Sequence, residues 1–383
     1  MSDYDKSPSN VFLHKSDVHL RQGRLCELVA PHVALGGVSL AYVMPNLVPP
    51  VTTTEAALSY RTTLEKLCPE TRFLVTLFLS PELTVEEVRK AHAAGVKGVK
   101  SYPRGVTTNS RTGVESYNRY YQVFTEMEKL GLVLNLHGEV PSSTRNARAA
   151  LNDISVLSAE AAFLPILIDL HMRFPKLRIV LEHATSKATV ETVKLCGPTV
   201  GCTITPHHLA LTVDGWAGQP LNFCKPVAKL ASDREALRQA IAEGNEHFFL
   251  GSDSAPHTLR KKMPSAHNHV HAQLASNFTS PEHGECPSCA AGIYSSPELL
   301  PLLAELFEDE SLGCKIPLER LEGFACTFGR NFYKEPIKSG EKAVVLQRCQ
   351  SGKRRICAGY AFVAEDGQHE YVRPFYADRE IGW

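Results

Sequence analysis

The feature that most constrains the fold of this chain is the regular alternation of short apolar segments with segments of helical period. The apolar segments are rich in β-branched and aromatic residues, which is typical of strands buried on both faces. Eight are found: Asp17–Leu20, Ser39–Met44, Phe73–Leu79, Gly98–Tyr102, Leu132–His137, Arg178–His183, Val200–Thr205 and His247–Ser252. Because such strands form a closed parallel sheet wrapped by helices, the sequence predicts an α/β fold, a (β/α)8 TIM-type barrel.

The same alternation predicts one barrel over residues 11–335. Residues 1–10 are predicted to be disordered, and residues 336–383 to form a short C-terminal β extension packed on the barrel. Residues 258–289 show little periodicity and are expected to form a long loop. Helix starts are predicted from S/T-x-x-E capping boxes at Thr52, Thr84 and Ser232, and a later helix is expected to kink or begin late at Pro165.

Composition limits the class of protein. The chain has 41 lysine and arginine residues and 41 aspartate and glutamate residues. It therefore lacks the excess of positive charge that binding to nucleic acid or an anionic membrane requires. No apolar run reaches the roughly 20 residues that span a bilayer, and the polar N-terminus has no signal-peptide character. We therefore expect a soluble cytoplasmic protein, in which the 11 cysteines are reduced core residues.

Ionisable and amide side chains stand at the carboxyl ends of the predicted strands. They are Asp17, His19, Asn46, Lys100, His137, His183 and Asp253. In a (β/α)8 barrel these ends meet on one rim, and imidazole and carboxylate groups are good zinc ligands. A buried neutral lysine can react with carbon dioxide to form a carbamate, whose two oxygens can bridge two metals. The pattern predicts a metal site on this rim.

Eight segments carry a resemblance to a known family. They read HLRQG (His19–Gly23), VMPNLVPPVTT (Val43–Thr53), VKSYPRGVTTNS (Val99–Ser110), LNLHGE (Leu134–Glu139), LEHAT (Leu181–Thr185), TITPHHL (Thr203–Leu209), NFCKPVAK (Asn222–Lys229) and GSDSAPH (Gly251–His257). The eight segments occur in the same order as in the monofunctional dihydroorotases of fungi and many bacteria, which belong to the amidohydrolase superfamily. The chain resembles this family.

The resemblance implies a site. His19, Lys100 (carboxylated) and Asp253 match ligands of a first zinc ion, and Lys100, His137 and His183 match those of a second. Asp253 also matches the general base that then acts as acid. The implied substrate contacts are Arg21, Asn46, Thr107, Thr108, Lys225, His257 and Ala291, with Thr107 and Thr108 in a loop that closes over the substrate.

The implied reaction is the reversible interconversion of L-dihydroorotate and N-carbamoyl-L-aspartate, a step of pyrimidine biosynthesis. The implied cofactor is a pair of Zn²⁺ ions bridged by carboxylated Lys100. The implied partners are this small-molecule substrate and, because the family is commonly dimeric, a second copy of the chain.

The chain departs from the family at the first strand. In the family the first strand carries the motif His-x-His, whereas this sequence reads Asp17-Val18-His19 at that place. Asp17 and His19 are two apart on a strand and share a face, so Asp17 can ligate in place of the missing imidazole. The alternatives are a crippled first metal site in a silent binding or scaffold protein, and an error or unusual splice in the sequence.

Two further readings stay open. A related cyclic amidase of the dihydropyrimidinase or allantoinase type would use the same chemistry, although Arg21 and Asn46 favour a substrate with a carboxylate. Three histidines (His267, His269, His271) and the Cys286-x-x-Cys289 pair resemble metal spacing but are interpreted as part of a polar surface loop. His207 and His208 are interpreted as pocket-wall residues or supports of the ligands.

Overall fold

The structure, a computed structural model, describes residues 9–11, 14–141, 154–263, 289–339, 341, 343–350 and 352–383. Its centre is an eight-stranded sheet in which every neighbouring pair is parallel and the strands follow chain order. The strands are β2 (His14–Val18), β3 (Val38–Val43), β4 (Arg72–Phe78), β5 (Gly98–Ser101), β6 (Val133–His137), β7 (Arg178–Glu182), β8 (Val200–Ile204) and β9 (Phe248–Leu250).

The first and last strands meet just beyond β9. Val18 forms a parallel bridge with Ser254, the His19 backbone N–H donates to the Ser254 carbonyl at 3.0 Å, and the Ser252 hydroxyl donates to the Asp17 carbonyl at 2.6 Å. These bonds close the sheet, and the predicted barrel is confirmed. The predicted first strand was placed too late, because β2 begins at His14 and its last residue is Val18.

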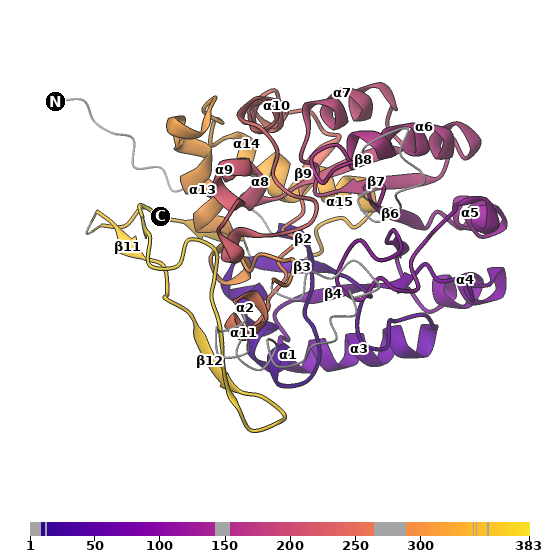
Figure 1. Ribbon diagram of the computed structural model, residues 1–383, viewed down its shortest axis with the longest axis horizontal. Helices are drawn as coiled ribbons and strands as arrows, with labels where there is room; N and C mark the ends of the chain where they lie inside the picture. The colour runs from indigo at the N-terminus through magenta and orange to yellow at the C-terminus, as the bar shows by residue number, and fades with distance from the viewer. Residues whose placement is uncertain are drawn as a thin grey trace, which may run out of the picture.

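Helices surround the sheet (Figure 1). The longer ones are α3 (Thr54–Leu67), α4 (Val85–Ala93), α5 (Tyr121–Leu130), α6 (Leu164–Arg173), α7 (Lys187–Leu195), α10 (Ala231–Ala242) and α13 (Leu299–Glu308). The shorter ones are α1 (Gly23–Val29), α2 (Pro31–Leu35), α8 (Pro206–Ala210), α9 (Val213–Trp216), α11 (Leu259–Lys262), α14 (Arg320–Glu322) and α15 (Phe328–Tyr333). Single turns complete them: η1 (Asn118–Tyr120), η2 (Ala161–Phe163), η3 (Pro220–Asn222), η4 (Ser296–Glu298), η5 (Glu310–Leu312) and η6 (Gly323–Thr327).

The predicted helix starts were only partly correct. Thr84 caps α4 and accepts from the Glu87 backbone N–H at 3.1 Å, and α6 begins late, with Pro165 in its first turn. The prediction at Thr52 was wrong by one residue, because Thr53 has the extended backbone and caps α3. The prediction at Ser232 was also wrong: this residue lies inside α10, whose first turn is stabilised by Asp233 accepting from the Leu230 N–H at 3.1 Å.

The inside of the barrel is apolar at its base and polar above it. Leu40, Leu74, Val133, Val180 and Phe249 form a buried cluster with the rings of Tyr42 and Tyr333. Above this cluster Asn135 accepts from the Tyr42 hydroxyl at 2.9 Å and donates to the Glu182 carboxylate at 2.7 Å. Gly98 makes room for this network, because a Cβ there would lie 2.3 Å from the Tyr42 hydroxyl oxygen.

The end of the chain packs on the barrel as short antiparallel pairs. β10 (Val344–Leu346) pairs with β1 (Ser9–Val11), β11 (Arg354–Arg355) with β14 (Glu380–Ile381), and β12 (Tyr360–Val363) with β13 (His369–Val372). Val372 and Ile381 are fully buried, so this extension covers part of the core. Residues 9 and 10, included in the predicted disordered segment, lie in β1, and residues 1–8 lie outside the described residues. So do residues 264–288 of the predicted long loop, including His267, His269, His271 and Cys286.

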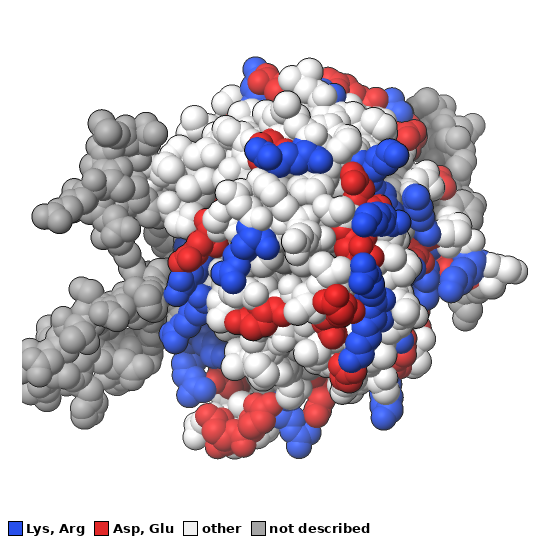
Figure 2. All heavy atoms as spheres, turned by 90° about the vertical axis from the view of Figure 1, so that its right-hand side faces the viewer, with Lys and Arg blue, Asp and Glu red and all other residues white. Residues whose placement is uncertain are grey.

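Figure 2 shows that basic and acidic side chains alternate over the face formed by the right-hand side of Figure 1. Their pairing accounts for the pattern, as in Arg89 with Glu126 at 2.8 Å and Arg173 with Asp169 at 2.7 Å. Within the described ranges no helix has the length and apolar character needed to cross a membrane. The ten cysteines of those ranges are all free thiols.

Candidate metal centre and substrate pocket

The predicted metal ligands gather where the strands end. His137 is the last residue of β6, His183 directly follows β7, and Lys100 lies on β5. His19 follows β2, and Asp253 follows β9. All five are at most 8% exposed, so the barrel removes their polar atoms from bulk water and leaves them to one another.

Backbone strain is concentrated at this rim. Four of the seven non-glycine residues with positive φ in the described part of the chain belong to it: Arg21 (+60°), Asn109 (+59°), His183 (+50°) and Asp253 (+42°). Such conformations cost energy and persist only where the surrounding contacts enforce them. Arg21, His183 and Asp253 follow strand ends, while Asn109 lies in the loop after β5.

The contact between His19 and Asp253 fits a cation. His19 Nδ1 lies 2.8 Å from the Asn46 side-chain oxygen, and the Asn46 amide nitrogen donates to the Thr108 carbonyl at 3.1 Å, which fixes the amide orientation. Burial lowers the pKa of His19, so the ring is neutral and its single N–H is at Nδ1. The unprotonated Nε2 therefore lies 3.0 Å from Asp253 Oδ1. Both atoms are acceptors, and a metal ion bound to both would remove their repulsion.

His137 and His183 form a second pair of donors. His137 Nδ1 lies 3.1 Å from His183 Nε2, and His137 Nε2 lies 2.7 Å from the Glu139 carboxylate. The N–H that His137 donates to Glu139 leaves Nδ1 free, the carboxylate–histidine arrangement common at metal sites. His183 Nδ1 is buried with no hydrogen-bond partner in the described residues. Glu139 stays ionised, because this hydrogen bond lowers its pKa although burial opposes the charge.

Lys100 lies between the two pairs along the rim and is 1% exposed. Its amine donates to the Glu182 carboxylate, which also accepts from Asn135. A carbamate on Lys100 would carry negative charge beside Glu182, so it requires bound cations to offset the repulsion. The donor chemistry of the rim fits two metal ions bridged by such a group.

Asp17 lies on the inward face of β2 and is 3% exposed. Its Oδ1 occupies the space above Gly251, where a Cβ would lie 2.3 Å from that oxygen. Within the described ranges one group of three His, Cys, Asp or Glu side chains has all its ligand atoms within 4.8 Å of one another, and it consists of His207, His208 and Cys224. Ligation by Asp17 therefore stays a prediction.

Six of the seven predicted substrate contacts line one small cavity, and the seventh, His257, contacts Arg21. The cavity is lined by His19, Arg21, Asn46, Tyr102, Thr107, Thr108, His137, His183, Lys225, Asp253, Ala255, Ala291 and Gly292. Its volume of about 30 Å³ holds a water molecule but no ring. The loop of Thr107 and Thr108 closes it, because Lys225 donates to the Val106 carbonyl at 2.7 Å and Asn109 to the Asn46 carbonyl at 2.9 Å.

Arg21 forms the cationic side of this cavity, and His257 contacts it from outside the lining. Arg21 Nε donates to the Pro256 carbonyl at 3.1 Å. His257 Nε2 lies 3.0 Å from an Arg21 terminal nitrogen and 2.9 Å from the Ala291 carbonyl oxygen, contacts that need opposite tautomers. Burial lowers the pKa of His257, so it is neutral and Arg21 is left as a positive group for an anion.

Comparison with known proteins decides the family. Residues 50–282 match the family described as amidohydrolase. A dihydroorotase from Mycosarcoma maydis is 50% identical over 385 aligned residues, which cover 96% of this chain and 95% of that protein. A dihydroorotase from Saccharomyces cerevisiae is 41% identical over 96% of this chain and 94% of its own length. The chain belongs to the dihydroorotase family.

Solved structures agree with this assignment. A crystal structure of dihydroorotase in complex with 5-fluoroorotic acid from Saccharomyces cerevisiae is 39% identical, with a TM-score of 0.83 over 98% of this chain and 97% of that chain. An L-hydantoinase (dihydropyrimidinase) from Arthrobacter aurescens has a TM-score of 0.74 at 19% identity, covering 98% of this chain and 81% of that chain, and shows the shared fold alone. The resemblance predicted from the sequence motifs is confirmed.

Sequence reasoning missed several polar residues of this dihydroorotase-family site, among them Glu139, Glu182 and Lys262. Glu139 stands two residues after His137 and thus on the same side of the chain, which was an available signal. Glu182 directly precedes His183 inside a strand, where a buried carboxylate is unusual. Lys262 lies in the predicted long loop, and nothing in the local sequence distinguishes it from the neighbouring Lys261.

Lys262 supports the segments that carry two predicted substrate contacts. It is 4% exposed and donates to the carbonyls of Phe223, Ala290 and Gly292 at 2.8–2.9 Å. The carbonyls of Ala290 and Gly292 flank Ala291. The Phe223 carbonyl lies two residues before Lys225. Burial lowers the pKa of Lys262 to about 8, which leaves the amine protonated at pH 7 with all three N–H groups used.

We expect Lys262→Met to lower the free energy of unfolding by roughly 2–4 kcal/mol, because three buried carbonyls lose their donor. Urea denaturation followed by circular dichroism measures this change. The matched control is Lys261→Met at the exposed neighbouring position, expected to change stability by less than about 0.5 kcal/mol. Equal effects of the two substitutions would contradict a supporting role for Lys262.

Proposed function

We propose that this chain catalyses the reversible hydrolysis of L-dihydroorotate to N-carbamoyl-L-aspartate in pyrimidine biosynthesis. The observation that carries the proposal is the pairing of metal-ligating groups, His19 with Asp253 and His137 with His183, beside the guanidinium of Arg21. The sequence identity to dihydroorotases over nearly the whole chain supports it. We also expect a cytoplasmic homodimer, as predicted from the sequence.

Two zinc ions are the proposed cofactor. His19, Asp253 and carboxylated Lys100 would hold the first, and Lys100, His137 and His183 the second. When bound, such a pair supplies a hydroxide nucleophile at neutral pH and polarises the amide carbonyl. Glu139 would hold His137 in the ligating tautomer through its hydrogen bond at 2.7 Å, and Asn46 would do the same for His19 at 2.8 Å.

Asp253 is the proposed proton carrier. Burial opposes the charge of Asp253, but the neighbouring imidazoles of His19 and His183 hold the pKa of this carboxyl well below its usual range. An ionised carboxylate at this point accepts the nucleophile's proton as the amide carbon is attacked and returns it to the leaving nitrogen. Its positive-φ backbone fixes the carboxylate toward the metal ligands.

Arg21 and Asn46 would bind the ring carboxylate of the substrate. Arg21 offers a planar fork with two parallel N–H donors, while the Asn46 amide exchanges its bond to Thr108 for one to the substrate. The loop bearing Thr107 and Thr108 must open to admit a ring into so small a cavity, and it then closes to exclude water. Lys225 and Ala291 also line the cavity.

A second candidate is a catalytically impaired dihydroorotase-like protein that binds or serves as a scaffold. One observation favours it: Asp17 stands where the family has the first histidine of His-x-His. A related cyclic amidase is disfavoured by Arg21, because a ring without a carboxylate would leave this part-buried cation without an anion.

We expect the purified protein, supplied with zinc and bicarbonate, to hydrolyse L-dihydroorotate. Asp17→His should change kcat by less than about 10-fold, whereas Asp17→Asn, which keeps the size but not the charge, should weaken zinc binding by about 10- to 100-fold. Steady-state kinetics and zinc titration measure both. A silent wild type that Asp17→His activates would instead establish the impaired protein.

We expect Arg21→Gln to lower kcat/KM for L-dihydroorotate roughly 100-fold, equivalent to about 3 kcal/mol of charge-assisted hydrogen bonding. The comparison substrate is dihydrouracil, a ring without the carboxylate, which the wild type should turn over poorly and Arg21→Gln should not affect further. The exposed Arg24 provides the control variant Arg24→Gln, with unchanged kinetics expected. Efficient turnover of dihydrouracil by the wild type would favour the amidase reading.

A further inference from the structure

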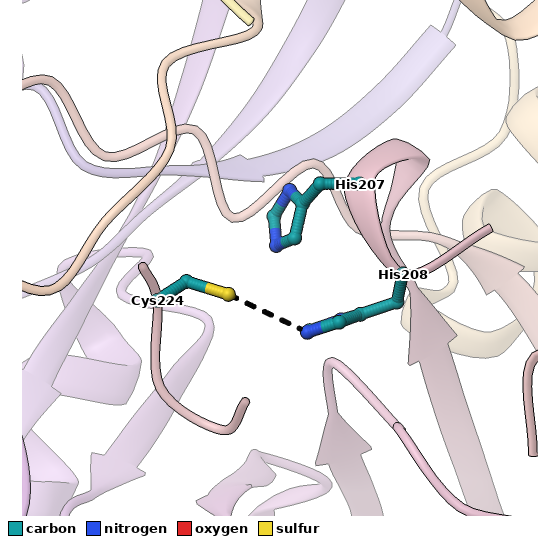
Figure 3. A group of neighbouring side chains, drawn as sticks. All are labelled: His207, His208 and Cys224. Atoms are coloured by element: carbon teal, nitrogen blue, oxygen red, sulfur yellow. Dashed lines mark hydrogen bonds between the residues drawn. The ribbon is translucent and has the colours of Figure 1, made fainter. Parts of the chain in front are cut away.

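A second cluster of metal-ligating groups lies apart from the strand-end ligands. His207 and His208 belong to α8, directly after β8, and Cys224 follows η3. All three are buried, and one ligand atom of each lies within 4.8 Å of the others. Figure 3 shows the three side chains converging on one point, with a nitrogen of the His207 ring directed into the space between Cys224 and His208.

We propose that His207, His208 and Cys224 bind a single zinc ion in a site separate from the proposed hydrolytic centre. Two imidazoles and a thiolate form a donor set that suits zinc and is poor for magnesium or calcium, which prefer oxygen. The site goes beyond the proposed function, since the hydrolysis described above uses none of these residues.

The separation of two of the three ligand atoms fits tetrahedral coordination. Zinc bonds of about 2.1 Å to nitrogen and 2.3 Å to sulfur place these two ligand atoms about 3.6 Å apart. Cys224 Sγ and His208 Nε2 are 3.6 Å apart. The Pro226 carbonyl oxygen lies 3.0 Å from His208 Nε2 and 3.4 Å from Cys224 Sγ, so it accepts a hydrogen bond from each in the absence of metal.

The His207 ring is the strongest indication of a missing ligand. It is fully buried, and neither ring nitrogen has a hydrogen-bond partner in the part of the chain that the structure describes. Burying an imidazole without partners is costly, and a metal bond on the inward nitrogen would offset that cost. Burial also lowers the pKa of His207 to about 4, which keeps the ring in the neutral form that metals bind.

The surroundings of His208 favour ligation, whereas Cys224 must lose a proton to ligate. The Thr205 hydroxyl lies 2.9 Å from His208 Nδ1, so it can hold the ring with Nε2 facing inward. Burial raises the pKa of Cys224 to about 12, with Lys262 and Lys229 opposing the shift and Asp253 and Glu139 adding to it. The thiol is therefore protonated without metal, and zinc binding would release that proton.

Zinc here would join the end of β8 to the segment that carries Lys225. Cys224 directly precedes Lys225, one of the residues lining the cavity. A metal bond at Cys224 would thus hold this side of the substrate pocket in place, a structural role that involves no step of the reaction.

Cobalt substitution of the full-length protein tests the proposal. Thiolate bound to Co²⁺ gives a near-ultraviolet charge-transfer absorption, and none of the ligands proposed for the hydrolytic centre is a cysteine. We expect wild type titrated with Co²⁺ to show this band. Cys224→Ser should abolish it and lower the metal content by one ion per chain, while Cys326→Ser, at another buried cysteine, should keep both.

His207→Gln provides a second variant if Cys224→Ser fails to fold. Because the His207 ring makes no hydrogen bond within the described residues, replacing it leaves no side-chain partner unsatisfied, and circular dichroism checks the fold. The band should be lost or strongly weakened in it. Absence of the band in wild type, or its persistence in folded Cys224→Ser, would overturn the proposal. Absorbance and metal content are measured without substrate. A protein that fails to hydrolyse dihydroorotate can therefore still confirm or contradict this metal site.

Discussion

The candidate site depends on the closure of the barrel between its first and last strands. The bridge from Val18 to Ser254, with the hydrogen bonds of His19 and Asp17 to the same segment, brings together residues more than two hundred positions apart in sequence. Only this closure places His19 against Asp253 at 3.0 Å. Without it the first strand would be a free edge, and the proposed first metal ion would lack one side of its coordination shell.

A second constraint follows from placing charges inside that closed sheet. Lys100, Glu182, His137 and Glu139 are all at most 3% exposed, and each is paired. Some of the pairings leave donor atoms directed at the same space, notably the bare nitrogens inferred for His19 and His137. A buried polar rim of this kind is costly as a structural core, and it becomes favourable when cations bind. The fold thus holds the ligands in place, and the metals would complete their pairing.

Particular elements show how far sequence reasoning reached. The strand ends were predicted well where an apolar run stops at a polar residue, as at His137. Helix caps were predicted less well: in the Thr52–Thr54 run three residues compete, and backbone geometry selects Thr53. Lys262 was missed because its three carbonyl partners come from two separate segments. His207 and His208 were noticed, but their proximity to Cys224, sixteen residues after His208, is not encoded in any local spacing.

The sequence by itself determined the barrel and the identity of most rim residues. The alternation of strands with helices and the polar residues at strand ends are local patterns, and only one arrangement buries the apolar strands. It also revealed the departure at Asp17. Tertiary structure alone decided which donors meet: His19 with Asp253, His137 with Glu139, Lys262 with three carbonyls, and His207 with Cys224. Such contacts depend on the twist and closure of the sheet and on loop paths, which bring distant segments within a few ångströms and leave no periodic trace in the chain.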